Sequence, residues 1–407
     1  MGILKKSHTL SLSVLLMVTF IDFMGMGLIY PIFSKLFFDT SIPFFSSETS
    51  SEIRGIWLGV LFALMPFIQF FSLPIWGAIS DKKGRKKPLL QSLSFSSLGH
   101  FISIFGIIFN SIWILVISRI ILGIGAGNIS IVQASIANIS TNEQKAKNFG
   151  LYAMAIGAGF TFGPFIGGGL SIYSFSFPFS FSCILTLINI VLAALFFKEP
   201  LHTLYEKAVS FSVGLKNLKK AFTTKAIRTF FLCSFLVSFA WTYFMDFSPV
   251  YLIKTFQFSS AQVGLFYGAI GGFYALSAGL LIRPLLSRYK TQLLFWASSF
   301  LGGLCILSIP YYPSYYWLIP FVIIYSYIIA FLNPTITTII SNNASSDMQG
   351  EALGLLGSVN TAAYAISALI AGVFVGMNPV FSMYIGGSVM LIASFIVLGV
   401  FKKKLFS

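Results

Sequence analysis

The sequence predicts an all-helical integral membrane protein, with twelve spanning helices in two pseudo-symmetric six-helix bundles and both termini in the cytoplasm. Of its 407 residues, 57% are hydrophobic and only 9% are charged, whereas a soluble domain carries about a quarter of its residues as charged side chains. The apolar residues gather in twelve runs, each near the length of about 20 residues that a spanning helix needs. The bilayer is therefore expected to be the main solvent of this chain.

The twelve runs follow one another with mostly short connections. The first opens after two lysines, as in a signal peptide, but it contains Asp22 and Pro31 and no A-x-A-like cleavage site follows it. We therefore interpret it as a retained first helix. The predicted spans are approximately Leu10–Phe37, Ile53–Ile79, Leu89–Phe109, Ile112–Ile139, Phe149–Ile172, Phe179–Phe197, Thr229–Ile253, Ala261–Ile282, Leu293–Ile309, Tyr315–Ile340, Ala352–Val375 and Val380–Phe401.

Positive charge alternates between the connections. The two termini and every second connection hold 22 of the 26 Lys and Arg residues, and the opposite connections hold only Lys35, Arg54 and Lys254. This is the positive-inside pattern, and it places both termini in the cytoplasm. It also accounts for the net charge of +15, so nucleic acid is excluded as a partner.

A basic stretch divides the chain into three parts. Residues 1–197 form the predicted N-terminal six-helix bundle, residues 198–228 a cytoplasmic linker, and residues 229–407 the C-terminal bundle. The linker carries Leu215 and Leu218 at helical spacing among lysines. It therefore predicts a short amphipathic helix on the anionic inner surface of the membrane.

The two halves show a weak internal repeat. Pro31 near the end of helix 1 matches Pro249 near the end of helix 7, and in helices 5 and 11 Gly168 falls on Gly372. Such repeats are typical of alternating-access transporters, whose substrate sites lie near the midplane between the repeats.

A short motif between predicted helices 2 and 3 carries a family resemblance. Gly77, Asp81, Gly84, Arg85 and Lys86 fit the pattern G-x-L-a-D-r-x-G-r-k, and this resembles the signature loop of the major facilitator superfamily. We expect the glycines to permit close approach and a tight turn, and Asp81 to pair with Arg85 as part of a conformational latch. The alternative is a basic loop with one incidental acid.

Helix 5 carries the most discriminating pattern. It reads G-x8-G-x3-G-P-x2-G-G, which is similar to the motif of drug/proton antiporters of this superfamily and is largely missing from its importers. The proline predicts a kink, and the glycines predict close helix packing where the two halves meet. These conformational-motif positions are Gly150, Gly159, Gly163, Pro164, Gly167 and Gly168.

Three charged residues inside spans are candidates for proton coupling: Asp22, Arg119 and Asp246. The surroundings of Asp22 resemble the first helix of tetracycline/proton antiporters, and Arg119 lies in the Arg-containing motif of helix 4. A carboxylate near mid-bilayer costs about 2.5–3.5 kcal/mol, which favours its protonation. We expect Asp22 to lose its proton when substrate or Arg119 engages it. A purely structural Asp22–Arg119 pair is the alternative.

The remaining candidates are less specific. Asp246 is interpreted as a second proton site, a contact for a cationic substrate, or a partner of Lys254. His100, within the third run, is more often a satisfied packing residue than a relay. The polar and aromatic residues that we consider as candidates for lining a substrate cavity are Asn128, Gln133, Trp241, Tyr243, Phe244, Asn333 and Asn360.

The resemblance implies proton-coupled efflux of a small amphipathic compound or drug by alternating access, in the cytoplasmic (inner) membrane of a bacterium. No Walker-type motif is present, so ATP is not expected to be the direct energy source. The three cysteines show no paired spacing, so no metal site is expected. We expect a monomer that needs no cofactor beyond the proton gradient. An importer or facilitator of the same fold, or a receptor that does not transport, remains an alternative. No cluster of His, Cys or carboxylates suggests an enzyme.

Overall fold

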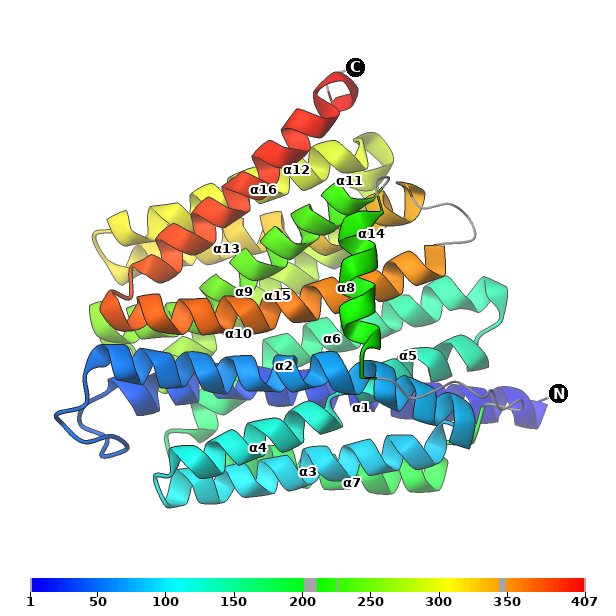
Figure 1. Ribbon diagram of the computed structural model, residues 1–407, viewed down its shortest axis with the longest axis horizontal. Coiled ribbons are helices and arrows are strands. Elements are labelled where there is room, and N and C mark those ends of the chain that lie inside the picture. Colours follow the sequence, from blue (N-terminus) through cyan, green and yellow to red (C-terminus); the bar gives the residue numbers. More distant parts are fainter. Residues whose placement is uncertain (1, 201–210, 225–226, 344–348, 406–407) are drawn as a thin grey trace. The chain divides into compact units, whose positions relative to one another are not determined.

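The computed structural model describes residues 2–200, 211–224, 227–343 and 349–405 (Figure 1). Within these residues, twelve helices are long and apolar enough to cross a membrane, from Thr9–Phe38 to Phe381–Val400. The prediction of an all-helical membrane protein with twelve spans is therefore confirmed.

Ten of the spans are single long helices and two are interrupted. The fourth span consists of α4 and α5, and the tenth of α13 and α14. The helices are α1 Gly2–Phe38, α2 Ser51–Lys83, α3 Lys86–Ile108, α4 Ile112–Gly125, α5 Asn128–Ile139, α6 Asn142–Leu170, α7 Phe177–Phe196, α8 Val213–Thr223, α9 Arg228–Phe256, α10 Ser260–Leu280, α11 Ile282–Arg288, α12 Thr291–Ser308, α13 Leu318–Ile329, α14 Leu332–Asn343, α15 Gln349–Met377 and α16 Phe381–Leu405.

By its contacts the chain forms two compact units. Unit 1 comprises Met1–Ile32, Leu64–Val213 and Ser260–Gly268, and unit 2 comprises Phe33–Ala63, Gly214–Ser259 and Ala269–Ser407. Helices α1, α2 and α10 thus contribute to both units. The bundle borders expected near residues 197 and 229 remain a prediction.

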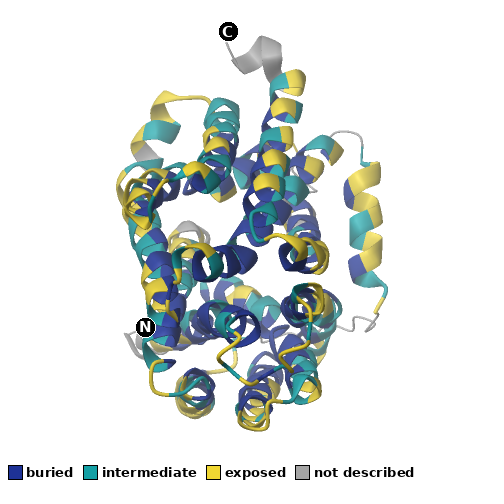
Figure 2. Cartoon of the chain, turned by 90° about the vertical axis from the view of Figure 1, so that its left-hand side faces the viewer, coloured by how far each residue is buried: buried dark blue, intermediate teal, exposed yellow. Residues whose placement is uncertain are grey.

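Helix α7 shows how membrane helices distribute polarity. Its buried residues include Ser182, Thr186 and Asn189, whereas its exposed residues include Ile184, Leu187 and Val191. This is the reverse of a soluble helix, and it fits a helix whose outer face meets lipid while its polar groups turn toward other helices. Figure 2 shows exposed and buried faces alternating along the helices.

In unit 1, the glycines of α6 bring its backbone against α1. A Cβ on Gly159 would lie 2.8 Å from the carbonyl oxygen of Phe20, and a Cβ on Gly163 would lie 3.0 Å from the Cα of Gly27. A Cβ on Gly167 would lie 2.6 Å from the carbonyl oxygen of Leu28. The motif of α6 therefore holds the stretch of α1 that carries Asp22.

Two further glycine contacts join helices from different halves of the sequence. In unit 1, a Cβ on Gly168 of α6 would lie 3.0 Å from the Cα of Gly264 of α10. In unit 2, a Cβ on Gly59 of α2 would lie 2.8 Å from the Cα of Gly372 of α15. Gly168 and Gly372 are the glycines matched in the predicted internal repeat, and each meets a glycine of another helix within its own unit.

Arg54 of α2 anchors the loop after α1. It is buried, and its guanidinium donates to the carbonyl oxygens of Phe37, Ser46 and Thr49 at 2.8, 2.9 and 3.1 Å. Asp39, at the start of this loop, has a pKa of about 2, which is below the ordinary value of an aspartate. Partial burial raises this pKa, but the hydrogen bonds from Lys35 and Ser41 lower it by more.

The predicted linker helix is present as α8. Asn217 donates to the hydroxyl of Ser358 at 3.2 Å, and Ala221 is buried, so one face packs within unit 2. Leu215 and Phe222 stay exposed. In Figure 1, α8 runs crosswise to the long helices of its unit. Its contact with a lipid surface remains a prediction.

The close contact of α6 with α1 generates a stability prediction. Gly163→Ala would place a methyl group 2.5 Å from the carbonyl oxygen of Met24, and such overpacking typically costs about 1–3 kcal/mol. We expect a lower melting temperature in detergent. Gly150→Ala is the matched control, because nothing lies within 4 Å of a Cβ at that position. Equal melting temperatures for the two variants would contradict the packing described.

Candidate functional site

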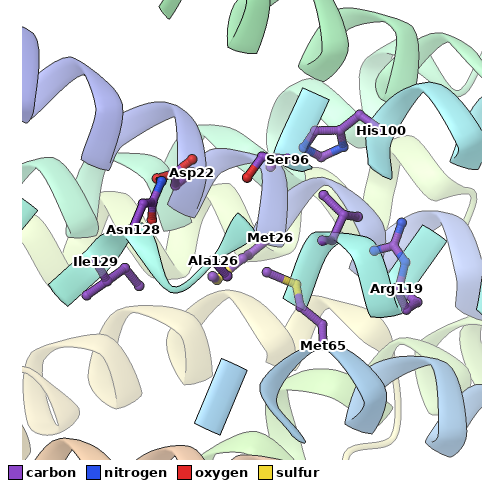
Figure 3. A pocket seen from close by; sticks show the side chains of 11 residues that line it. Asp22, Met26, Met65, Ser96, His100, Arg119, Ala126, Asn128 and Ile129 are labelled. Carbon is purple, nitrogen blue, oxygen red and sulfur yellow. The ribbon is translucent and has the colours of Figure 1, made fainter. Parts of the chain in front are cut away.

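A small cavity lined by both polar and apolar residues lies inside unit 1, among α1, α2, α3, α4 and α5 (Figure 3). It has about 20 Å³ of space for the centres of water molecules, which is room for about one ordered water. Two of the predicted proton-coupling residues, Asp22 and Arg119, line it together. Its lining is Asp22, Gly25, Met26, Met65, Ser96, His100, Arg119, Leu122, Ala126, Asn128 and Ile129.

The partner of Asp22 is Asn128. The Asn128 Nδ2 atom donates to the Asp22 Oδ2 atom at 2.6 Å, and Asn128 is 0% exposed. Its Oδ1 atom has no hydrogen-bond partner in the described part of the chain. An amide offers both a donor and an acceptor, so it suits a carboxylate and a protonated carboxyl alike. A cationic partner would favour the carboxylate alone.

Asn128 follows a break in the fourth span that the sequence analysis did not predict. The expected continuous helix Ile112–Ile139 is instead interrupted at Ala126 and Gly127. Carbonyl groups freed by such a break need donors inside the protein, since the bilayer offers none.

Three side chains of α2 supply these donors. Gln69 Nε2 donates to the Ala126 carbonyl at 3.2 Å, Ser72 Oγ to that of Gly123 at 2.8 Å, and Trp76 Nε1 to that of Ile124 at 2.8 Å. The break is therefore a supported feature, and it fixes the place where Asn128 meets Asp22.

Arg119 is 1% exposed and bonds within the same unit. Its Nη2 atom donates to Ser103 Oγ at 2.8 Å, and its guanidinium carbon lies 5.7 Å from the centre of the Phe179 ring. The structure thus brings Asp22 and Arg119 to one cavity but gives each a neutral polar neighbour. Ser103 was not among the predicted residues.

The loop after α2 forms a second polar cluster. Arg85 Nη1 lies 2.7 Å from Asp81 Oδ1, as expected, and also 2.6 Å from Ser80 Oγ. The backbone at Gly84 has φ = +83°, a conformation that favours glycine. Gly77 faces Ser130 of α5, whose hydroxyl would lie 3.7 Å from a Cβ there.

The position of this motif corrects one expectation. It was placed between helices 2 and 3, but α2 continues to Lys83 and so contains Gly77 and Asp81. An apolar run marks only the part of a helix within hydrocarbon, and α2 continues beyond it with charged residues.

Glu199, which the sequence analysis missed, completes the cluster. Its carboxylate accepts from the backbone N–H groups of Arg85 at 2.8 Å and Lys86 at 2.9 Å. The first N–H groups of a helix have no carbonyl partner within the helix, so the Glu199 carboxylate satisfies two of them at the start of α3. The helix dipole also favours a negative charge at this end.

The sequence of residues 15–368 matches the family described as Major Facilitator Superfamily. The chain belongs to the major facilitator superfamily. It is therefore a membrane transporter of small molecules, and the cavity of unit 1 is a cavity within a transporter fold.

Individual relatives agree with this assignment. The quinolone resistance protein NorA of Staphylococcus aureus is 28% identical over 387 residues, covering 93% of each chain. The class H tetracycline resistance protein of Pasteurella multocida is 33% identical over 189 residues, which is 46% of this chain and 44% of that protein. Among solved structures, the human organic anion transporter MFSD10 has a TM-score of 0.71 at 20% identity, covering 96% and 99% of the chains.

The other charged candidates of this major facilitator protein lie in unit 2. Asp246 of α9 is buried and lies within electrostatic range of Tyr364 of α15. Lys254, considered as its partner, donates to Ser51 Oγ at 3.1 Å and lies 4.7 Å from the centre of the Phe38 ring. The role of Asp246 remains a prediction.

The predicted cavity-lining residues occupy different settings. In unit 1, Gln133 donates to the Tyr152 hydroxyl at 3.2 Å. In unit 2, Trp241 stacks on Tyr325 with ring centroids 6.4 Å apart, and Tyr243 and Phe244 are fully buried. The Asn360 side-chain oxygen accepts hydrogen bonds from Ser234 and Ser238 at 2.8 and 3.1 Å. Asn333 is exposed. Of the seven, Asn128 alone lines the cavity with Asp22.

The Glu199 contact generates a prediction about the loop cluster. Glu199→Ala leaves two backbone donors of α3 without their acceptor, and loss of an N-terminal cap costs about 1 kcal/mol. We expect a lower melting temperature for Glu199→Ala and partial rescue by Glu199→Gln, which keeps one acceptor oxygen. Lys87→Ala, an exposed change in the first turn of α3, should have no effect. Equal stability of Glu199→Ala and Lys87→Ala would refute the capping role.

Proposed function

We propose that this transporter exports a small amphipathic compound or drug in exchange for protons, with Asp22 as the proton-carrying residue. The observation that carries the proposal is the contact of Asp22 with Asn128 at the wall of a cavity that Arg119 also lines. A carboxyl group held at mid-span by a neutral amide can exist in both protonation states, which a proton carrier requires.

Arg119 supplies the competing charge. In the proposed cycle, Asp22 binds a proton from the outer side and is neutral. Approach of substrate, or movement of Arg119 along the shared cavity, then stabilises the carboxylate, and the proton leaves toward the cytoplasm. The cycle requires that Asp22 and Arg119 reach the same space, and their common cavity supports this.

The glycine contacts support alternating access. Gly168 with Gly264, and Gly59 with Gly372, are backbone contacts at helix ends opposite the basic connections. Contacts without side chains can separate and re-form with little rearrangement, because no interdigitated side chains must be withdrawn. We propose that they close the outer side of the transporter in one state and open in the other.

Efflux is favoured over uptake by the α6 motif and by the names of two relatives. NorA and the class H tetracycline protein are named for drug resistance, and both come from bacteria. We therefore propose export from the cytoplasm across a bacterial inner membrane, by a monomer. Uptake by an importer or facilitator is the competing function, and it predicts substrate movement without Asp22-dependent proton exchange.

The first test is substrate-induced proton release from detergent-solubilised protein. Wild type and Asp22→Asn are mixed with a panel of quinolones, tetracyclines and simple organic cations while a pH dye reports release. We expect release by wild type and none by Asp22→Asn, because an amide cannot carry the proton. Glu48→Gln is the matched control, since it removes an exposed carboxylate outside the spans and should release protons as wild type does.

Two results would contradict the proposal. Release of protons by Asp22→Asn at the wild-type level would place the exchange site elsewhere. Binding of a compound by wild type without proton release would favour a facilitator or a receptor.

A further inference from the structure

His100 of α3 is unlike an ordinary packing histidine. It is 8% exposed, and its Nδ1 atom has no hydrogen-bond partner among the described residues. A buried ring nitrogen without a partner is costly, so a histidine kept only for packing is expected to have its nitrogens satisfied. The imidazole also lines the cavity that contains Asp22.

Gly25 keeps the imidazole close to α1. A Cβ at this position would lie 3.3 Å from both the Cε1 and Nε2 atoms of His100. Gly25 is three residues after Asp22, so the two face the same side of α1. In Figure 3, Asp22, Ser96 and His100 follow one another along the cavity.

We propose that His100 is a second proton-transferring group of this site, linked to Asp22 by one water molecule in the cavity. The inference rests on the proposed function, and it identifies His100 as the group that receives the proton from Asp22. The cavity has the volume for about one water. The Asp22 carboxyl, the Ser96 hydroxyl and the His100 imidazole all line this cavity, and the His100 Nδ1 atom has no protein partner in the described residues.

The transfer balances as follows. The O–H bond of the Asp22 carboxyl breaks and its proton passes to the water, while the water gives one of its protons to Nδ1 of the neutral imidazole. An N–H bond forms, the water is restored, and a carboxylate and an imidazolium result. Reversal returns His100 to neutrality, and so does transfer of the Nε2 proton to a second water molecule, which becomes hydronium.

The charges around His100 favour brief protonation during proton transfer over a stably protonated imidazolium. Arg119 on α4 is a cation on the same cavity and opposes a lasting imidazolium, while Asp22 on α1 attracts one. From α7, the Ser182 hydroxyl lies near Gly25, 3.9 Å from a Cβ built there, and it carries no charge. The charge on His100 is therefore short-lived, which suits fast transfer.

Infrared spectroscopy of the full-length protein tests the relay without a known substrate. The carboxyl band of Asp22 is the band that disappears in Asp22→Asn, and its rate of change after a pH jump is followed. A positioned proton-transfer group typically contributes about 100-fold, so we expect a loss near that size in both His100→Leu and His100→Asn. Ser182→Ala, a neighbouring buried change of a group that does not titrate, should leave the rate unchanged.

The outcomes separate the two proposals. An Asp22 band that changes at the wild-type rate in His100→Leu would overturn the relay and leave the proton role of Asp22 intact. Absence of any titrating Asp22 band in wild type would overturn both.

A second measurement does not require a His100 variant to fold. The chain has three histidines, His8, His100 and His202, so His8→Gln with His202→Gln leaves His100 as the single nitrogen-15 label. We expect its Nδ1 resonance to move between this protein and the same protein with Asp22→Asn. Identical resonances would overturn the link.

Discussion

Every polar group that enters the hydrocarbon layer must find its partner inside the protein, and this constraint governs the structure around Asp22. A carboxyl group in the middle of a span is stable only if neighbouring groups form hydrogen bonds with it. Here the hydrogen bond comes from the amide of Asn128, which donates to Asp22 at 2.6 Å. Its neutrality is the important property, because a cation at the same place would stabilise the carboxylate alone and remove the reason for a proton to bind.

The surrounding helices can be understood as support for that contact. Asn128 stands where it does because the fourth span breaks at Ala126 and Gly127, and the break persists because donors from α2 satisfy its carbonyl groups. The glycines of α6 in turn bring its backbone against α1 on either side of Asp22. Helix α6 thus positions the helix that carries the carboxyl group, helix α2 supports the break that precedes its amide, and neither contributes a charged residue to the cavity lining.

The spans, the position of Asp22 within one of them and the Asp81–Arg85 pair could be predicted because each has a signal in the local sequence. These signals are the length of an apolar run, an isolated acid within such a run, and a spacing of four residues. It did not predict contacts between residues far apart in the chain. Nothing near Asp22 identifies a partner 106 positions away, and nothing in the Gly84–Arg85 loop identifies Glu199. The break at Ala126 was missed because a run of glycine and alanine is compatible with a helix as well as with an interruption. His100 was considered a packing residue because its missing partner is visible only in three dimensions.

The dependence of uphill transport on Asp22 is the most direct test of this account. A substrate defined by proton release would be added outside inside-out proteoliposomes with an acid lumen, and its accumulation in the lumen would be compared in wild type and Asp22→Asn. The account predicts that wild type accumulates the substrate until a protonophore removes the gradient, while Asp22→Asn only equilibrates it across the membrane. Accumulation by Asp22→Asn at the wild-type level, or equilibration alone by wild type, would contradict proton exchange at Asp22.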